Sequence, residues 1–134
     1  MYSLAKFNKL NSKIQNFRRE KLSFRPTQLH KLENLSAEYG VNIYIKRDDL
    51  IGFSTFGGNK IRKLEYLFAD IVKQGAKYVF TYGATQSNHA MQTAIAARKY
   101  GLKPILYLVD VLGEEINFPR ANMLLGEILG AEVK

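Results

Sequence analysis

The sequence contains no cysteine and only two histidines among its 134 residues. Without cysteine, disulfide scaffolds, thiol nucleophiles and thiolate metal sites are excluded. Because His30 and His89 are the only imidazoles, we expect no metal site. No run of eighteen apolar residues occurs, and the basic first twenty residues lack the apolar centre of a signal peptide. We therefore expect a cytoplasmic protein without a membrane segment.

The formal net charge of +8 is concentrated at one end of the chain. Residues 1–31 hold eight Lys and Arg against one Glu, a net +7, whereas the other 103 residues hold twelve against eleven, a net +1. An excess confined to one terminal stretch is typical of a solvated lead-in segment. The alternative is a basic arm that binds a polyanion, but the aromatic residues there show no stacking repeat. We do not expect nucleic acid to be the partner.

Strand-like and helix-like apolar patterns alternate from residue 41 onward. Val41, Ile43 and Ile45 alternate with polar residues, as in a strand with one buried face. The pattern then predicts, in order, a helix over 61–71, a strand over 78–82, a helix closed by Gly101, a strand over 105–109 buried on both faces, a helix with Pro119 in its first turn, and a strand over 131–134. This alternation predicts an α/β fold with parallel strands and flanking helices. Because the chain stops inside a strand, we expect a partial chain, and the alternative is a short edge strand.

The first polar loop, Phe56-Gly57-Gly58-Asn59-Lys60, follows a strand and opens a helix. Ligands of α/β proteins bind at such strand ends. Asn59 suits the N-cap position, and the positive end of the helix dipole then favours a neutral amine on Lys60. A neutral amine can attack an aldehyde, and paired glycines let the backbone approach a planar ring. On its own, the loop favours the simpler interpretation of an exposed lysine after an ordinary turn.

The second polar loop runs from Gly83 to Ser87 and leads into an alanine-rich helix. Ser87 or Asn88 can cap that helix, and a helix N-terminus with short polar side chains suits a substrate carboxylate. Asn88 can also donate to a ring oxygen. Simple capping explains the loop without any ligand. His89 is expected to be a surface or packing residue, because no carboxylate near it in sequence would orient it.

Other catalytic and nucleotide-binding motifs are missing. The sequence has no G-x-x-x-x-G-K-[ST] and no G-x-G-x-x-G, which argues against mononucleotide and dinucleotide binding. Asp48 and Asp49 are adjacent and would point apart, so they do not form a carboxylate pair for glycoside hydrolysis. We interpret them as turn residues or as ion-pair partners of Arg47 and Lys46.

Three segments that occur in one order are more specific than either loop alone. They are Lys46-Arg47-Asp48-Asp49-Leu50, Gly57-Gly58-Asn59-Lys60-Ile61-Arg62-Lys63-Leu64-Glu65 and Gln86-Ser87-Asn88-His89. From about Arg25 to Lys134 the chain resembles the D-cysteine desulfhydrase and 1-aminocyclopropane-1-carboxylate (ACC) deaminase family, whose members have the tryptophan-synthase-β-like fold and use pyridoxal 5'-phosphate (PLP). Asn122-Met123-Leu124-Leu125 and Leu129-Gly130-Ala131-Glu132 resemble the small-domain helix and strand of that family.

The resemblance implies a role for each matching residue. Lys60 would hold PLP as a Schiff base and move the α-proton of the substrate. Asn88 would bind the ring hydroxyl of PLP. Ser87 would bind the substrate carboxylate and, in the deaminase branch, assist proton transfer or attack, while the backbone at Asn88 and His89 would complete the carboxylate pocket. The catalytic residues would thus be Lys60 and Ser87, and similar enzymes are homodimers.

The resemblance also implies a division of the chain. Residues 1–77 would be the N-terminal part of the large PLP domain and residues 78–134 the start of a smaller α/β domain, with the cofactor between them. The family's phosphate loop, the group that faces the pyridine nitrogen and a tyrosine near the substrate would lie beyond Lys134, so we expect the 134 residues alone to be inactive. One mild departure is Gln28, where similar enzymes usually have proline.

The sequence leaves three functional hypotheses. The first is a PLP-dependent lyase that converts D-cysteine to pyruvate, ammonia and hydrogen sulfide. The second is ACC deaminase, which shares every motif visible here; a cysteate-type desulfonating lyase belongs to the same class. The third is a non-catalytic fragment or binding module with a basic N-terminal arm, and the presence of Lys60 and Ser87 argues against it.

Overall fold

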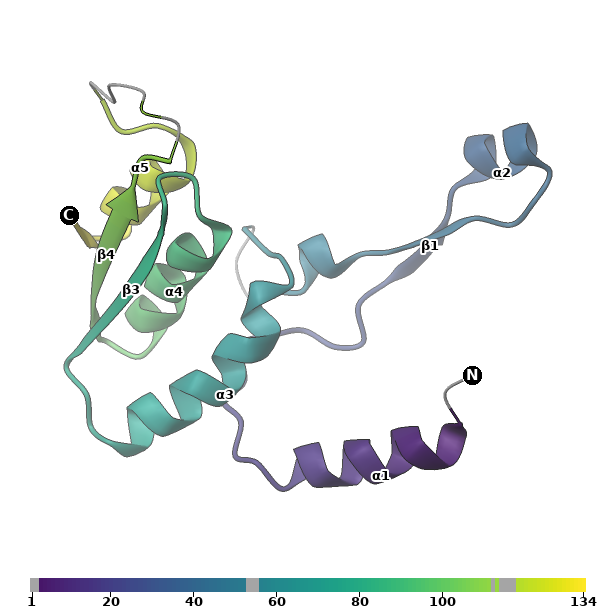
Figure 1. Cartoon of the computed structure of the whole chain (residues 1–134), viewed down its shortest axis with the longest axis horizontal. Coiled ribbons are helices and arrows are strands. Elements are labelled where there is room, and N and C mark those ends of the chain that lie inside the picture. The colour runs from purple at the N-terminus through teal and green to yellow at the C-terminus, as the bar shows by residue number, and fades with distance from the viewer. Residues whose placement is uncertain (1–2, 53–55, 112, 114–117) are drawn as a thin grey trace.

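The computed structural model describes residues 3–52, 56–111, 113 and 118–134. Its elements in chain order are α1 (Leu4–Gln15), β1 (Leu29–Lys31), α2 (Glu33–Tyr39), β2 (Tyr44–Lys46), the 3-10 helix η1 (Asp48–Leu50), α3 (Lys60–Lys73), β3 (Tyr78–Ala84), α4 (Asn88–Lys99), β4 (Lys103–Val109), α5 (Ala121–Ile128) and β5 (Glu132–Val133). The strands form an antiparallel pair, β1-β2, and a parallel sheet in the order β3-β4-β5 (Figure 1). The predicted α/β class with parallel strands and flanking helices is confirmed.

The parallel sheet forms where the apolar runs predict it. β3 pairs with β4 over their full lengths, in a register that sets Tyr78 opposite Lys103. β5 adds a short third strand, and the Lys134 backbone N–H donates to the Leu106 carbonyl at 2.8 Å. The expected strand at 131–134 is therefore present, at the edge of the sheet.

α4 and α5 pack on the same face of this sheet. Leu106 points toward both helices, is 1% exposed, and clusters with Ala90 and Ala94 of α4. A Cβ built on Gly126 of α5 would lie 2.8 Å from Leu106 Cδ1, so α5 approaches the strand closely. The predicted alanine stripe is confirmed as a packing surface.

The opposite face of the sheet is open among the described residues. Phe80 and Tyr82 of β3 are 65% and 67% exposed, and Val109 of β4 is 58% exposed. The Tyr82 and Tyr107 rings stack there at 5.2 Å. The expectation that residues 105–109 are buried on both faces is wrong for this structure, because both helices lie on one side.

A second core joins α3 to α4 and β3. Its buried members are Leu22, Ile51, Ile61, Leu64, Phe68, Val79, Ala96, Ala97 and Leu102. Because these residues come from both sides of the expected boundary at 77/78, the two halves of the described chain share one core. The division into a PLP domain and a smaller domain stays a prediction.

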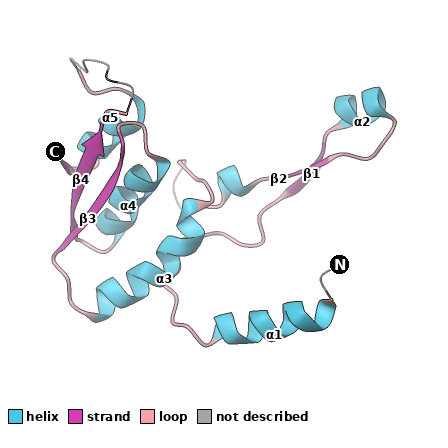
Figure 2. Cartoon of the chain, in the orientation of Figure 1, coloured by secondary structure: helices cyan, strands magenta, loops and turns pink. Residues whose placement is uncertain are grey.

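β1, β2 and α2 form an arm that extends away from α3 (Figure 2). The antiparallel pairing sets Leu29 opposite Lys46. All three residues of β2 are exposed and Val41 is 57% exposed. The prediction of a strand with one buried face is therefore wrong in this region, because the arm leaves the core.

The basic N-terminal stretch contains a helix that the sequence analysis did not predict. Ser3 caps α1 by accepting a hydrogen bond from the Lys6 backbone N–H at 3.3 Å. No residue of α1 is buried. Its apolar side chains Leu4, Phe7, Leu10 and Ile14 are 40–75% exposed. Within the described part of the chain, α1 and the other helices are too short or too polar to cross a membrane.

The last helix begins later than its sequence suggests. α5 starts at Ala121 with Arg120 at the N-cap, so Pro119 precedes the helix instead of occupying its first turn. The fold thus places two helix starts, those of α3 and α4, next to the loops that carry the predicted site residues.

Candidate functional site

Lys60 is the first residue of α3. Asn59 occupies the N-cap position, as predicted, but has helical dihedral angles and makes no side-chain cap hydrogen bond. Instead the Arg62 backbone N–H donates to the Asn59 carbonyl at 3.2 Å, which tightens the first turn. Lys60 is half-buried as a residue, and its amine donates to Asn59 Oδ1 at 3.2 Å in an exposed hydrogen bond. Backbone hydrogen bonds, without a side-chain cap, therefore stabilise the first turn of α3, in which Lys60 lies.

The two glycines before Lys60 are required by contacts within the protein. A Cβ on Gly57 would overlap the Asp49 carbonyl. Gly58 has a φ of 137°, and a Cβ there would lie 2.7 Å from Gln92 Nε2. These contacts account for both glycines without a bound ring.

Gln92 connects this loop to α4. Its Nε2 donates to the Gly57 carbonyl at 3.0 Å, although the two residues are 35 positions apart. The side chain is 1% exposed and its Oε1 has no hydrogen-bond partner among the described residues. The sequence did not identify Gln92 as a site residue, because its only signal is a polar side chain among the alanines of α4.

A carboxylate and a guanidinium also fix the start of α3. Arg62 donates to Asp48 through Nε at 2.8 Å and Nη2 at 2.7 Å, and Thr27 Oγ1 donates to the same carboxylate at 3.1 Å. The Arg62 hydrogen bonds lower the pKa of Asp48 to about 2. The expected pair of Asp49 with Arg47 is confirmed, at 2.6 Å. Asp48 pairs with Arg62, which the sequence analysis did not consider.

Glu65 anchors the preceding chain to the next turn of α3. The side chain is 1% exposed. It accepts hydrogen bonds from Ser23 Oγ at 2.5 Å, from Arg25 Nη2 at 2.6 Å and from the Leu22 backbone N–H at 3.2 Å. Glu65 and Asp48 together hold one side of the helix that begins with Lys60.

Ser87 caps α4, as predicted. Its Oγ accepts from the Ala90 backbone N–H at 3.2 Å. A Cβ on Gly83 would overlap the Ser87 side chain, so glycine is needed where β3 ends. The Asn88 and His89 backbone N–H groups lie in the first turn and have no partner within the helix. In this cap Ser87 Oγ acts as a hydrogen-bond acceptor, so the hydroxyl proton of Ser87 can still be donated to a ligand.

Asn88 lies next to Ser87 and contacts the start of α5. Asn122 Nδ2 donates to Asn88 Oδ1 at 2.7 Å and to the Gln86 carbonyl at 3.0 Å. The Asn122 backbone N–H donates to Gln86 Oε1 at 3.0 Å, and Gln86 Nε2 donates to the Arg120 carbonyl at 3.2 Å. Four hydrogen bonds therefore hold the second loop against α5.

The His89 side chain turns toward α3. It lines a mostly apolar hollow of about 300 Å³ between α3, β3 and α4, and its Nδ1 is buried without a partner among the described residues. Burial lowers the pKa of His89, and the positive charges of Lys63 and Lys60 lower it further. The Gln92 contacts show that the loop before α3 lies against α4. The side-chain placement agrees with the expected packing role.

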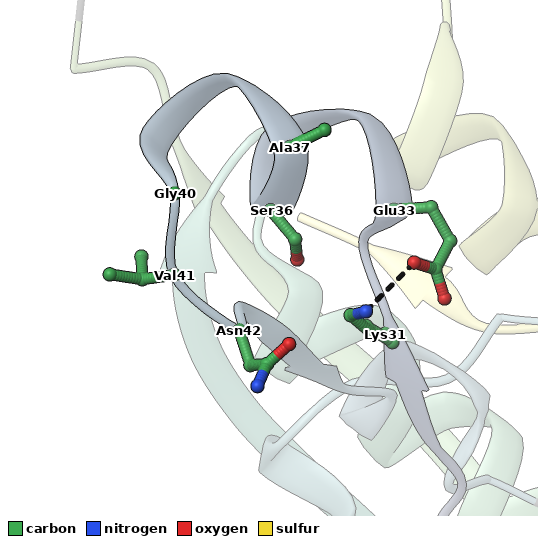
Figure 3. Close-up of a pocket in the computed structure, with 7 residues that line it drawn as sticks. All are labelled: Lys31, Glu33, Ser36, Ala37, Gly40, Val41 and Asn42. Carbon is green, nitrogen blue, oxygen red and sulfur yellow. Dashed lines mark ion pairs between the residues drawn. The ribbon is translucent and has the colours of Figure 1, made fainter.

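Another hollow lies outside this region. It measures about 250 Å³ and is lined at α2 by Lys31, Glu33, Ser36, Ala37, Gly40, Val41 and Asn42 (Figure 3). An exposed ion pair between Lys31 and Glu33 borders it, at 3.0 Å. It lies on the arm, which carries none of the predicted site residues. In the part of the chain that the structure describes, no group of three or more His, Asp or Glu residues could hold a metal ion.

These features define a class of site. Lys60 lies at one helix start, and the Gln92 contact holds the loop before it against α4. The start of α4 presents a hydroxyl, an amide and backbone N–H groups that have no partner within the helix. The amine suits a cofactor aldehyde, and the second start suits its ring oxygen and a carboxylate. The residues present therefore fit an α/β enzyme of the PLP-dependent class.

Comparison with known proteins gives the family. A family model described as pyridoxal-phosphate dependent enzyme matches residues 21–134. The chain belongs to the pyridoxal-phosphate dependent enzyme family, whose cofactor is PLP. The resemblance, the enzyme class and the cofactor expected from the sequence are confirmed at this level.

Individual relatives show which enzymes within the family the chain is similar to. A Thermotoga maritima protein named "Putative 1-aminocyclopropane-1-carboxylate deaminase" is 52% identical over 112 residues, which are 84% of this chain and 34% of that protein. A Yersinia enterocolitica protein named D-cysteine desulfhydrase is 44% identical over 126 residues, covering 92% of this chain and 38% of that protein. Both names predicted from the sequence thus occur among the relatives.

A solved structure shows the same fold. The crystal structure of an ACC deaminase homologue superposes with a TM-score of 0.81 at 45% identity, covering 94% of this chain and 37% of that chain. The tryptophan-synthase-β-like PLP fold expected from the sequence is confirmed by this match. The chain spans about a third of the length of the relatives it matches.

Proposed function

We propose that the protein is a PLP-dependent lyase or deaminase of a small amino acid, with D-cysteine as its first candidate substrate. The observation that carries the proposal is the hydrogen bond from Gln92 of α4 to the Gly57 carbonyl, which holds the loop before Lys60 against the helix that Ser87 caps. Membership of the PLP-dependent family and the Yersinia relative named D-cysteine desulfhydrase support it.

Lys60 is the proposed cofactor lysine and proton carrier. The residue is half-buried and directly follows the loop that Gln92 holds in place. When bound, PLP supplies an electron sink that stabilises negative charge at the substrate α-carbon. Lys60 Nζ is proposed to remove the α-proton of the amino acid and to return a proton later.

Ser87, Asn88 and His89 are proposed to bind and orient. The Ser87 hydroxyl and the backbone N–H groups of Asn88 and His89 can donate to a substrate carboxylate. Asn88 Nδ2 can donate to the ring hydroxyl oxygen of the cofactor. These donors would fix the substrate so that its α-proton faces Lys60 Nζ.

ACC is the second candidate substrate. The Thermotoga relative at 52% identity and the solved homologue both carry ACC deaminase in their names. The same donors would bind its carboxylate, and Ser87 would assist proton transfer or attack. Membership of a family of PLP-dependent enzymes also argues against the binding-module hypothesis.

Turnover by the complete gene product tests the function. D-cysteine is expected to give pyruvate, ammonia and hydrogen sulfide, whereas ACC would give a four-carbon 2-oxo acid and ammonia. Borohydride reduction of the PLP-loaded protein, followed by peptide mapping, is expected to label Lys60. Lys60→Ala should abolish both label and turnover, and the exposed neighbour Lys63 provides a matched control, because Lys63→Ala should retain the label. The proposal would be contradicted if the label were spread over surface lysines, or if Lys60→Ala kept both the label and turnover.

A further inference from the structure

Asn122 makes the polar contact that orients the Asn88 side chain. It is half-buried at the second position of α5, and its Nδ2 lies 2.7 Å from Asn88 Oδ1. We propose that Asn122 is a positioning residue for the cofactor site, which aims the Asn88 amide so that its NH2 group faces the cofactor. This inference rests on the proposed role of Asn88 in binding the ring oxygen.

The chemistry of one backbone carbonyl fixes the orientation of both amides. The Gln86 carbonyl can only accept a hydrogen bond, so the Asn122 atom 3.0 Å from it must be the NH2 nitrogen. The same Asn122 nitrogen also contacts the Asn88 side chain. If the contacting Asn88 atom were its NH2 nitrogen, two hydrogen-bond donors would face each other. The contacting Asn88 atom is therefore the oxygen, which leaves Asn88 Nδ2 free.

The alternative orientation of Asn88 would harm cofactor binding. With its amide reversed, Asn88 would present an oxygen to the cofactor's ring oxygen, so that two acceptors would face each other. An acceptor pair loses the hydrogen bond and adds repulsion between the oxygen atoms. Asn122 excludes this arrangement because its NH2 group accepts no hydrogen bond.

Asn122 is itself held by hydrogen bonds between the start of α5 and the loop before α4. Its backbone N–H donates to Gln86 Oε1, and Gln86 Nε2 donates to the Arg120 carbonyl. The start of α5 and the loop before α4 therefore bond reciprocally. The Asn122 side chain is held by its own bond to the Gln86 carbonyl, so that it can impose its orientation on Asn88 with little further loss of conformational entropy.

A double-mutant cycle in the complete gene product tests the inference. The PLP dissociation constant and the visible absorption maximum of bound PLP are measured for Asn88→Ala, Asn122→Ala and the double variant. Asn122→Ala is expected to weaken PLP binding about tenfold and to shift the band in the same direction as Asn88→Ala. The double variant should match Asn88→Ala alone, because Asn122 acts through Asn88.

Three further variants separate positioning from folding. Asn122→Asp keeps the shape of the side chain but cannot donate, so it should reproduce the band shift of Asn122→Ala. Gln86→Ala removes the side-chain bonds to the Asn122 N–H and the Arg120 carbonyl, and should shift the band in the same direction as Asn122→Ala. Glu127→Gln changes an exposed side chain at the other end of α5 and should leave the band unchanged.

The outcomes distinguish the two proposals. Additive effects of Asn88→Ala and Asn122→Ala, or an unchanged band in both Asn122 variants, would overturn the positioning role while the role of Asn88 stands. Unchanged PLP binding in Asn88→Ala would overturn the proposed role of Asn88 and the inference with it.

Discussion

Gln92 Nε2 donates a 3.0 Å hydrogen bond to the Gly57 carbonyl, which joins the middle of α4 to the loop before Lys60. The bond is part-buried: Gln92 is 1% exposed and Gly57 is half-buried. It makes the position of the Lys60 loop dependent on the position of α4. The Gln92 side-chain amide therefore links the two parts of the proposed site, the loop before Lys60 and the helix that begins with Asn88.

Gln92→Leu should destabilise the protein and weaken PLP binding. The change leaves the Gly57 carbonyl without its partner, at a cost of about 1–3 kcal/mol. Urea unfolding and a PLP titration measure the two effects. The exposed Gln74 at the end of α3 is the control, and Gln74→Leu should change the unfolding free energy by less than about 0.5 kcal/mol. Equal unfolding midpoints for the two variants would contradict the coupling.

Glu65→Gln should destabilise the junction between α3 and residues 22–25. The carboxylate is buried and accepts from Arg25, Ser23 and the Leu22 backbone N–H. Loss of its charge weakens these charge-assisted hydrogen bonds, and we expect a loss of about 1.5–3 kcal/mol in the unfolding free energy.

An exposed ion pair supplies the control for Glu65. The side chain of Glu33 is 73% exposed and pairs with Lys31. Glu33→Gln should cost less than about 1 kcal/mol, because solvent screens such a pair. If both substitutions had the same small effect in denaturant unfolding, Glu65 would not be the anchor that its contacts indicate.

Asp48 should make the protein sensitive to acid. Its pKa is lowered from 3.8 to about 2, first by the hydrogen bonds from Arg62. A carboxylate with a depressed folded-state pKa stabilises the fold above its unfolded value, and this contribution is lost as the pH falls from about 3.8 toward about 2. Asp48→Asn should lower stability at neutral pH and flatten the acid limb of the stability curve. The exposed Asp70 on α3 is the control, and Asp70→Asn should leave that limb steep.

His89 should respond to the charge of Lys63. Burial and then Lys63 and Lys60 lower the pKa of His89 below its usual 6.5. The fold therefore disfavours the protonated ring, and the resulting stability is present above pH 6.5 and declines as the pH falls below it. Lys63→Gln should raise the pKa of His89 in an NMR titration of the imidazole. Lys73→Gln, at the far end of α3, should not, and an equal shift in both variants would refute the local effect.

Much of the fold could be predicted because its signals are local. The apolar runs at β3 and β4, the alanines of α4 and the glycines that follow α3 and α4 each reflect the conformation of a few neighbouring residues. Ser87 as a helix cap belongs to the same group. The prediction failed where burial depends on distant elements. Whether Val41 or Val109 is covered depends on where helices pack, and no local pattern records that.

The sequence by itself determined the α/β class, the two loops that carry Lys60 and Ser87, and the family, because these depend on residue types at fixed spacing along the chain. Only the tertiary structure decided which residues hold those loops. Gln92 is 35 positions from Gly57, and Asn122 is 34 positions from Asn88. Partners so far apart are set by the packing of α4 against α3 and α5, since a hydrogen bond requires two groups to meet in space and not in sequence.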